Sequence, residues 1–214
     1  RIHHSQPPAD AELLSRAWTD VMVGHLLIRP PLFFVVYPVL RRVLQFDDDE
    51  TQPVVLWRSA LQLMVTIQID DFLYYWVHRM LHHRLLYKHF HKQHHEFKNS
   101  VPIAAEYSSI VEDLLSSTVP TVAGSLILRV RWELFVFYVC MKLHQSMDAH
   151  CGYILPFPLS PYNCYAIGLD CAGNHDFHHS ANVGCYGGYF QFWDHIMGTN
   201  TAYLKAKAKE AKGA

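Results

Sequence analysis

The sequence His78-Arg-Met-Leu-His82 is followed by His91-Lys-Gln-His94-His95, and these two clusters constrain how the chain can fold. Residues three and four apart share one face of a helix, so each cluster can direct its histidines toward one metal ion. At about 100° per residue, an unbroken helix would point the second cluster far around its axis from the first. A shared site therefore requires a bend or helix break between positions 83 and 91.

A third cluster, His175-Asp-Phe-His178-His179, repeats the H-x-x-H-H spacing, and Gly173-Asn174 before it is predicted to cap its helix. A single histidine on an apolar face is better explained as a hydrogen-bonded core residue. Eight histidines at chelating intervals in three clusters instead indicate metal binding, and His150 is a candidate for a ninth ligand.

The number of histidines bears on how many ions are bound. Imidazole suits zinc, copper, iron and nickel alike, whereas a structural zinc site closes with four ligands. Eight or nine histidines exceed the need of one ion, so the sequence predicts two. Soluble di-iron bundles use Glu-x-x-His motifs, which are absent from these clusters, so this site would be an all-imidazole variant.

Carboxylates near the clusters could accept the second ring N–H of a ligating histidine, which fixes the orientation of its ring. The candidates are Asp71, Glu96, Asp148 and Asp176, each of which could equally be a helix cap or a solvated surface residue. We favour Asp176, which lies inside the third cluster.

The composition indicates a membrane protein. Half of the residues are hydrophobic and 17% are charged, compared with about 25% charged in soluble domains. Four apolar stretches, at about 21–44, 54–77, 103–128 and 132–149, predict an all-α integral-membrane bundle of about four helices. Each stretch is interrupted by charged residues or proline, and the alternative is a soluble all-helical core.

If the third and fourth stretches cross as a hairpin, all the histidine clusters lie on one side of the membrane. The positive-inside rule then places the site in the cytosol, because basic residues are more numerous on that side. The site side carries Arg1, Arg16, Arg79, Arg84, Lys88, Lys92, Lys98 and four tail lysines, against Arg41, Arg42, Arg129 and Arg131 on the other side.

Other features of the chain narrow the choice of function. The net charge of −1 offers no basic surface for a nucleic acid. The five cysteines are scattered without C-x-x-C spacing and are expected to be reduced thiols.

The prolines between 156 and 161 exclude regular helix there. Residues 1–214 suit one domain, and the start at Arg1 without a secretory pattern is compatible with a fragment or a processed form.

Together, the three clusters resemble the histidine boxes of the fatty acid hydroxylase and sterol desaturase superfamily. The similarity extends between the boxes and is strongest to the methylsterol oxidase branch. It is carried by Asp71-Phe-Leu-Tyr-Tyr-Trp-Val, Ala104-Ala-Glu-Tyr107, Glu112-Asp113, Asp148-Ala-His150-Cys-Gly-Tyr153, Asn182-Val-Gly-Cys-Tyr-Gly and Trp193-Asp-His-Ile-Met-Gly-Thr199. Cys151 stands where the branch usually has serine, which leaves the fine specificity open.

The resemblance implies a multi-pass enzyme of the endoplasmic reticulum membrane with a di-iron site facing the cytosol; zinc could occupy the site in purified protein. It also implies electrons from cytochrome b5 or its reductase, and a lipid substrate, foremost a sterol. The metal-binding and catalytic histidines would be His78, His82, His91, His94, His95, His150, His175, His178 and His179, whereas His83, His89, His144 and His195 fall outside the pattern.

The favoured function is an oxygen-dependent monooxygenase that hydroxylates a lipid C–H bond, foremost a methyl group at carbon 4 of a sterol. One alternative is a sterol or fatty acid desaturase or hydroxylase of the same superfamily. Another is a non-catalytic membrane metal-binding protein that retains the boxes. A hydrolytic metalloenzyme is disfavoured because the chain lacks the H-E-x-x-H motif.

Overall fold

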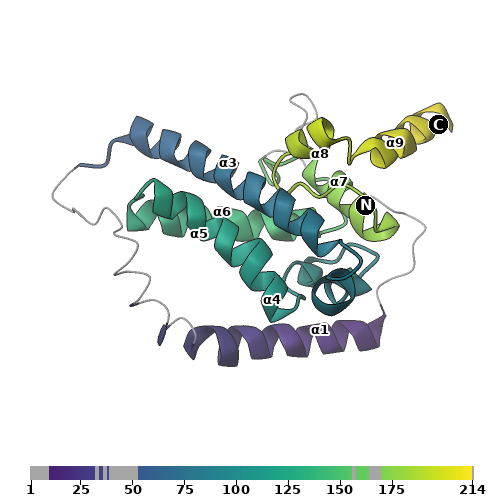
Figure 1. The fold of residues 1–214 in the computed structure, drawn as a ribbon, viewed down its shortest axis with the longest axis horizontal. Helices are drawn as coiled ribbons and strands as arrows, with labels where there is room; N and C mark the ends of the chain where they lie inside the picture. The colour runs from purple at the N-terminus through teal and green to yellow at the C-terminus, as the bar shows by residue number, and fades with distance from the viewer. Residues whose placement is uncertain are drawn as a thin grey trace.

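The computed structural model describes residues 10–31, 34, 35, 38, 53–155, 158–163 and 170–213. Regular structure in these ranges is helical and includes no β-strand, in agreement with the predicted all-α class. Figure 1 shows α3 (Leu56–Leu81) as a long helix crossing the molecule, with α1 (Ala11–Val23) along one edge. Whether residues 1–214 form a single domain stays a prediction.

The first predicted apolar stretch is only partly described. Helix α1 begins ten residues earlier than expected, after Asp10, whose side chain accepts a hydrogen bond from the backbone N–H of Glu12 at 3.2 Å. It continues as the π-helix η1 (Gly24–Ile28). Most of the stretch beyond position 31 lies outside the described residues.

Helix α3 carries the first histidine cluster at its C-terminal end. The helix stops at Leu81, and His82 is its C-cap. A turn follows, then the π-helix η2 (Tyr87–His91) and the 3₁₀ turn η3 (His94–Glu96). The predicted break between the first and second clusters is therefore confirmed.

The chain then leaves the histidines and returns to them. A short 3₁₀ turn, η4 (Pro102–Ala105), precedes α4 (Ile110–Glu112), η5 (Asp113–Thr118) and α5 (Val119–Ile127), which run on as one helical segment packed on α3. A turn with a left-handed residue at Arg129 (φ 46°) leads into α6 (Trp132–Ala149), which ends at His150. The third and fourth apolar stretches therefore run out and back as a helical hairpin (Figure 1), while their crossing of a membrane stays a prediction.

One helical segment in the described part of the chain, Ile110–Ile127, is long and apolar enough to cross a membrane. Helices α3 and α6 also match predicted stretches, but both contain charged residues such as Asp70, Asp71 and Lys142. Four membrane helices remain a prediction.

The C-terminal region brings the third histidine cluster back to α3. Helix α7 (Cys171–Ala181) has Asp170 at its N-cap and ends at Asn182, whose left-handed backbone (φ 52°) stops the helix. The prediction that Gly173-Asn174 caps this helix is wrong, because both residues lie inside its first turn. Gly173 is needed there because a Cβ atom would lie 2.5 Å from Oδ1 of Asp170.

Two further helices close the chain, α8 (Phe192–Met197) and α9 (Thr201–Gly213). The lysine-rich tail predicted as a solvated helix is α9, which is held at its start because Tyr203 and Lys207 both bind the Asp170 carboxylate. Residues 158–161 of the proline-rich segment are not helical, as predicted, whereas positions 156 and 157 lie outside the described residues.

Polar residues fill much of the interior, while large apolar side chains face outward. Asp70, Asp71, Glu112 and most of the clustered histidines are buried. In contrast, Leu56 and Trp57 of α3 are 80% and 72% exposed, and Phe137 of α6 is 56% exposed. Large apolar side chains thus lie on the outside of α3 and α6, while the acids of α3 lie inside. The described thiols, at Cys140, Cys151, Cys171 and Cys185, are free, as expected.

The contact between α3 and α5 depends on a small residue. A Cβ atom at Gly124 would lie 2.9 Å from Cα and 3.0 Å from the carbonyl oxygen of Thr66, and backbone atoms cannot rotate away. We expect Gly124→Ala to lower the stability of the protein in detergent by about 1–3 kcal/mol. Thermal unfolding measures this change.

Gly24→Ala is the matched control, because no atom lies within 4 Å of its Cβ position. That variant should be neutral or more stable, since alanine restricts the unfolded chain. Equal midpoints for Gly124→Ala and the wild type would contradict the close approach of α3 and α5.

Candidate metal centre

All nine histidines singled out from the sequence gather in two adjacent groups. The five-histidine group holds His78, His82, His91, His95 and His178, and the four-histidine group holds His94, His150, His175 and His179. Within each group the ligand atoms lie within 4.8 Å of one another. The two groups abut, because the rings of His95 and His179 stack with centroids 4.7 Å apart.

Each H-x-x-H-H cluster is divided between the two groups. In the second cluster, His91 and His95 join the five-histidine group and His94 joins the other. In the third cluster the assignment is reversed, because His178 alone joins the five-histidine group. Side chains at i+3 and i+4 differ in direction by about 100° around a helix. This divergence lets one short segment serve two neighbouring centres.

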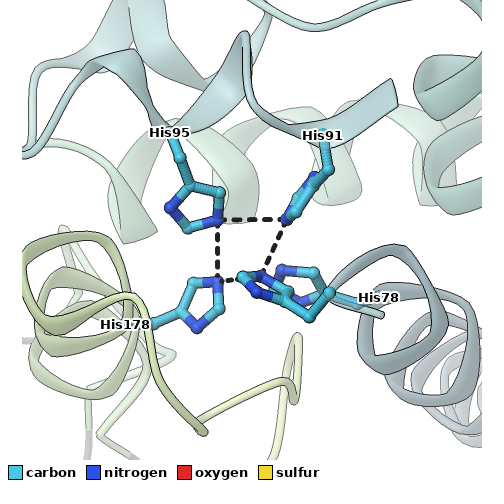
Figure 2. Close-up of side chains that lie close together, drawn as sticks. His78, His91, His95 and His178 are labelled. Carbon is cyan, nitrogen blue, oxygen red and sulfur yellow. Dashed lines mark hydrogen bonds between the residues drawn. The ribbon is translucent and has the colours of Figure 1, made fainter. Parts of the chain in front are cut away.

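In the five-histidine group, four Nε2 atoms form a closed ring. The separations are 2.9 Å from His91 to His82, 3.0 Å from His95 to His91, and 3.1 Å from His178 to each of His95 and His82. Figure 2 shows His91, His95 and His178 converging from different segments with His78 beside them. The Nε2 atom of His78 is buried and has no hydrogen-bond partner among the described residues.

The four-histidine group has the same character. The Nε2 atom of His175 lies 2.9 Å from that of His150 and 3.1 Å from that of His179. The Nε2 atoms of His150 and His94 are 3.4 Å apart. All four imidazoles are buried, so their nitrogens lie close to one another and away from bulk water.

The outer nitrogens of several of these rings are held by the protein. Backbone carbonyls accept from Nδ1 of His78 (Tyr186, 2.9 Å), His178 (Gly184, 2.5 Å), His179 (Phe97, 3.0 Å) and His150 (Ser146, 2.7 Å). A neutral imidazole has one N–H, and these contacts place it on Nδ1. The Nε2 atoms therefore present lone pairs to the centre of each group.

A carboxylate performs the same role at His91, but it is one that sequence reasoning missed. Oε1 of Glu112 accepts from Nδ1 of His91 at 2.8 Å, with both side chains buried. Three of the four predicted acids have other partners: Asp71 binds the N–H groups of Tyr189 and Phe190, Glu96 binds Arg16 and Tyr107, and Asp148 binds Ser160 and Asn163. The favoured residue, Asp176, is buried. One sequence feature could have identified Glu112 as a site residue. It is an acid within an apolar stretch, and such residues usually face a site.

Asp194 was also missed as a site residue. Its carboxylate accepts from the backbone N–H groups of Tyr186 at 2.8 Å and Gly187 at 2.7 Å, and from the Thr199 hydroxyl at 2.6 Å. These bonds fix the loop whose carbonyls hold His78 and His178. The loop also needs Gly184, because a Cβ atom there would lie 2.0 Å from the carbonyl oxygen of Thr199.

The electrostatics of the site keep the histidines neutral. Burial lowers the pKa of His150 to about 4 and that of His82 to about 2. Burial, reinforced by neighbouring imidazoles, drives the pKa of His94, His175, His178 and His179 well below the ordinary value. Neutral imidazole is the form that binds metal ions.

The donor set fits metal ions. First-row ions bind imidazole nitrogen at about 2.0–2.1 Å, so two such nitrogens at right angles are about 3 Å apart, close to the separations in both groups. Inward lone pairs in a buried space repel one another unless a cation lies between them. The predicted outsiders His83, His89, His144 and His195 belong to neither group.

One hollow adjoins the histidine groups, and a second lies beside it. A cavity of about 40 Å³ is lined by His94, His150 and His175 together with polar residues of α4, η5 and α6. A groove of about 500 Å³, a size suited to a small ligand, lies between α1, η1 and the segment 106–113. Ser108 lines both.

Comparison with known proteins identifies the family. The family model for fatty acid hydroxylase matches residues 63–199, which is more than half of the chain and includes every histidine of both groups. This chain belongs to the fatty acid hydroxylase family. Family membership and the two histidine groups together indicate a metal site.

Several curated proteins are similar to the chain. Methylsterol monooxygenase 1 of Rattus norvegicus is 39% identical over 86% of this chain and 61% of its own length. Methylsterol monooxygenase 2-2 of Arabidopsis thaliana is 28% identical over 98% of this chain and 76% of its own length. A very-long-chain aldehyde decarbonylase of Oryza sativa is 30% identical over 92% of this chain and 64% of its own length. No solved structure matches the chain.

The depressed histidine pKa values predict how the metal-free protein responds to acid. The folded pKa lies below the unfolded value of about 6.5, so the unfolded state binds more protons between pH 6.5 and about 4. Stability is therefore lost as the pH falls below about 6.5. Between pH 7.5 and 5.5 we expect a loss on the order of 1 kcal/mol for each fully buried histidine.

Thermal unfolding of chelator-treated protein at several pH values measures this effect. His89→Ala, which removes an exposed histidine, should leave the profile unchanged. A flat profile in the wild type would show that the clustered histidines are not buried in the neutral form.

Proposed function

We propose that this protein is a membrane-bound di-iron monooxygenase that uses molecular oxygen to oxidise a lipid C–H bond, and that its substrate carries a sterol C-4 methyl group. The observation that carries the proposal is the convergence of nine histidines into two adjacent groups. His78, His82, His91, His95 and His178 would hold one iron, and His94, His150, His175 and His179 the other. The similarity to methylsterol monooxygenases supports the substrate.

Iron is favoured over zinc by the form of the site. Structural zinc is held in closed sites of four ligands, whereas the five-histidine group offers a fifth nitrogen and adjoins a second group. When bound, a pair of iron ions would supply the electrons that activate oxygen. Zinc remains an ion that purified protein could carry, since imidazole binds it well.

The chain's own residues would orient and isolate this chemistry. The carbonyls of Tyr186, Gly184 and Phe97 and the Glu112 carboxylate keep the N–H of their histidines at Nδ1. Burial keeps bulk water away from the histidine groups. The 40 Å³ cavity admits a molecule the size of dioxygen or a few waters, and the 500 Å³ groove would take the body of the lipid.

The distribution of apolar residues supports placement in a membrane. Exposed side chains such as Leu56 and Trp57 of α3 and Phe137 of α6 would contact lipid chains. We further propose location in the endoplasmic reticulum membrane with several spans, a site facing the cytosol, and cytochrome b5 or its reductase as electron donor. The excess of basic residues on the histidine side supports this orientation.

The direct test is metal analysis of detergent-purified protein expressed with iron, combined with oxygen uptake. We expect about two irons per chain and uptake that depends on reductant, a cytochrome b5 system and a 4-methylsterol. His175→Ala should lower the iron content to one per chain or less and abolish substrate-dependent uptake. His195→Ala, an exposed histidine outside both groups and both hollows, is the matched control.

The other outcomes separate the alternatives. Iron without sterol-dependent uptake, with turnover of other lipids, would replace the sterol assignment by a related hydroxylase or desaturase, which product analysis distinguishes. Bound zinc without oxygen consumption would favour a non-catalytic metal-binding protein. Activity retained in protein that contains no metal would overturn the proposal.

The bond between Glu112 and His91 gives a second prediction. Glu112→Ala removes the acceptor of the His91 N–H, and we expect metal affinity to fall about 10- to 100-fold. Glu112→Gln keeps a neutral oxygen acceptor and should lose less. Competition with a chelator of known affinity measures both variants. Glu133→Ala, on an exposed side chain, should bind metal like the wild type, and equal affinity in Glu112→Ala would contradict the assigned role.

A further inference from the structure

The 40 Å³ cavity beside the four-histidine group is more polar than oxidation of an alkyl group requires. Besides His94, His150 and His175 it is lined by Ser108, Ser116 and Gln145. Polar groups in a buried space are costly unless they have hydrogen-bond partners. Ser116 and Gln145 already donate to the carbonyl oxygens of Glu112 and Gly188, so the case for a polar ligand rests on the charged groups that also line the cavity.

Lys142 supplies a fixed positive charge at this cavity. It lies on α6 eight residues before His150, and Gln145, Ser146 and Ala149 on the same helix also line the cavity. Its ammonium nitrogen is 2.6 Å from Oδ1 of Asp70, and its side chain is 11% exposed. Asp70 is fully buried. A buried lysine without this partner would be strongly disfavoured.

Aromatic rings hold the ammonium group from two directions. The nitrogen lies 5.0 Å from the ring centroid of Tyr74 and 4.9 Å from that of Tyr189. An ammonium group has three N–H donors, and the hydrogen bond to Asp70 uses one of them. Lys142 can therefore donate to an oxygen atom placed in the cavity.

Glu112 provides a complementary acceptor. Its Oε1 accepts from His91, while its Oε2 is buried and has no hydrogen-bond partner among the described residues. Glu112 lines the same cavity. A buried carboxylate oxygen without a donor is costly, so a ligand that donates a hydrogen bond here would be stabilised.

We propose that this cavity binds the hydroxyl group of the lipid. Lys142 donates a hydrogen bond to the hydroxyl oxygen, and Glu112 accepts one from the hydroxyl O–H. Lys142 is then a specificity-determining residue. The inference rests on the proposed function and narrows its substrate class. A hydroxyl both donates and accepts, whereas a ketone or ether only accepts and a carboxylate would be repelled by Glu112. The cavity adjoins the histidines, so the attacked carbon lies near the hydroxyl.

The size of the two hollows agrees with this class. A volume of about 40 Å³ accommodates a hydroxyl-bearing corner of a lipid, since one water needs roughly 10–15 Å³ on the same measure. The body of the lipid would lie in the 500 Å³ groove, which meets the cavity at Ser108. A sterol with a hydroxyl on carbon 3 and a methyl group on carbon 4 has the required arrangement.

The test is equilibrium binding of matched sterols to detergent-purified protein without reductant, so that no turnover occurs. Tryptophan fluorescence would be titrated with a 4-methylsterol bearing a 3-hydroxyl, its 3-methoxy ether and its 3-deoxy analogue. We expect the alcohol to bind about 10- to 100-fold more tightly than the deoxy analogue, as hydrogen bonds to charged groups imply, with the ether in between. This ligand series needs no variant.

Lys142→Met combined with Asp70→Asn removes the donor without leaving a buried unpaired carboxylate. This double variant should bind all three sterols with nearly equal affinity while its metal content stays unchanged. Lys88→Met, on an exposed lysine of η2, should keep the full preference for the alcohol and serves as the control.

Two results would overturn the inference. Equal binding of alcohol and deoxy analogue by the wild type would make the cavity a water pocket, and preference retained in the double variant would exclude Lys142. Neither result bears on metal content or oxygen uptake. Failure of the proposed function would appear separately, as absent iron or absent uptake in the wild type.

Discussion

The hydrogen bonds from Nδ1 of five of the nine histidines to the protein are the interactions on which the site depends. A free imidazole can turn either nitrogen inward and can carry its proton on either. Acceptors at Tyr186, Gly184, Phe97, Ser146 and Glu112 remove that freedom at five of the nine rings. The helices deliver the histidines to one place, and these acceptors determine which atom of these five rings faces the centre.

Most of those acceptors belong to irregular segments and not to the helices that carry the histidines. The loop that follows α7 supplies two of them, and the Asp194 carboxylate holds that loop through the N–H groups of Tyr186 and Gly187. The geometry of the site therefore depends on a residue that touches no histidine. Asp194 and the loop that it holds therefore support the metal centre by positioning His78 and His178, although they do not face the ions themselves.

The sequence predicts the histidines well because chelation requires particular residue types at helical spacing. All nine candidates lie in the two groups, and both the break after α3 and the return of α6 follow from requiring a shared site. The acceptors could not be predicted, because a backbone carbonyl leaves no mark in the sequence. Glu112 was visible only as an acid in an apolar stretch. The error at Gly173-Asn174 arose because that glycine is required by the approach of Asp170 and Tyr203 and not by a helix end.

The division of each H-x-x-H-H cluster between two centres ties their occupancies together. An ion held by the five-histidine group would fix the backbone of residues 91–95 and 175–179, and the same segments present His94, His175 and His179 to the other group. The first ion would thus already order part of the backbone that the second ion needs for its own binding. Two sites coupled through shared rigid segments influence each other equally in both directions, so we expect the chain to fill cooperatively and a half-loaded protein to be a minor species.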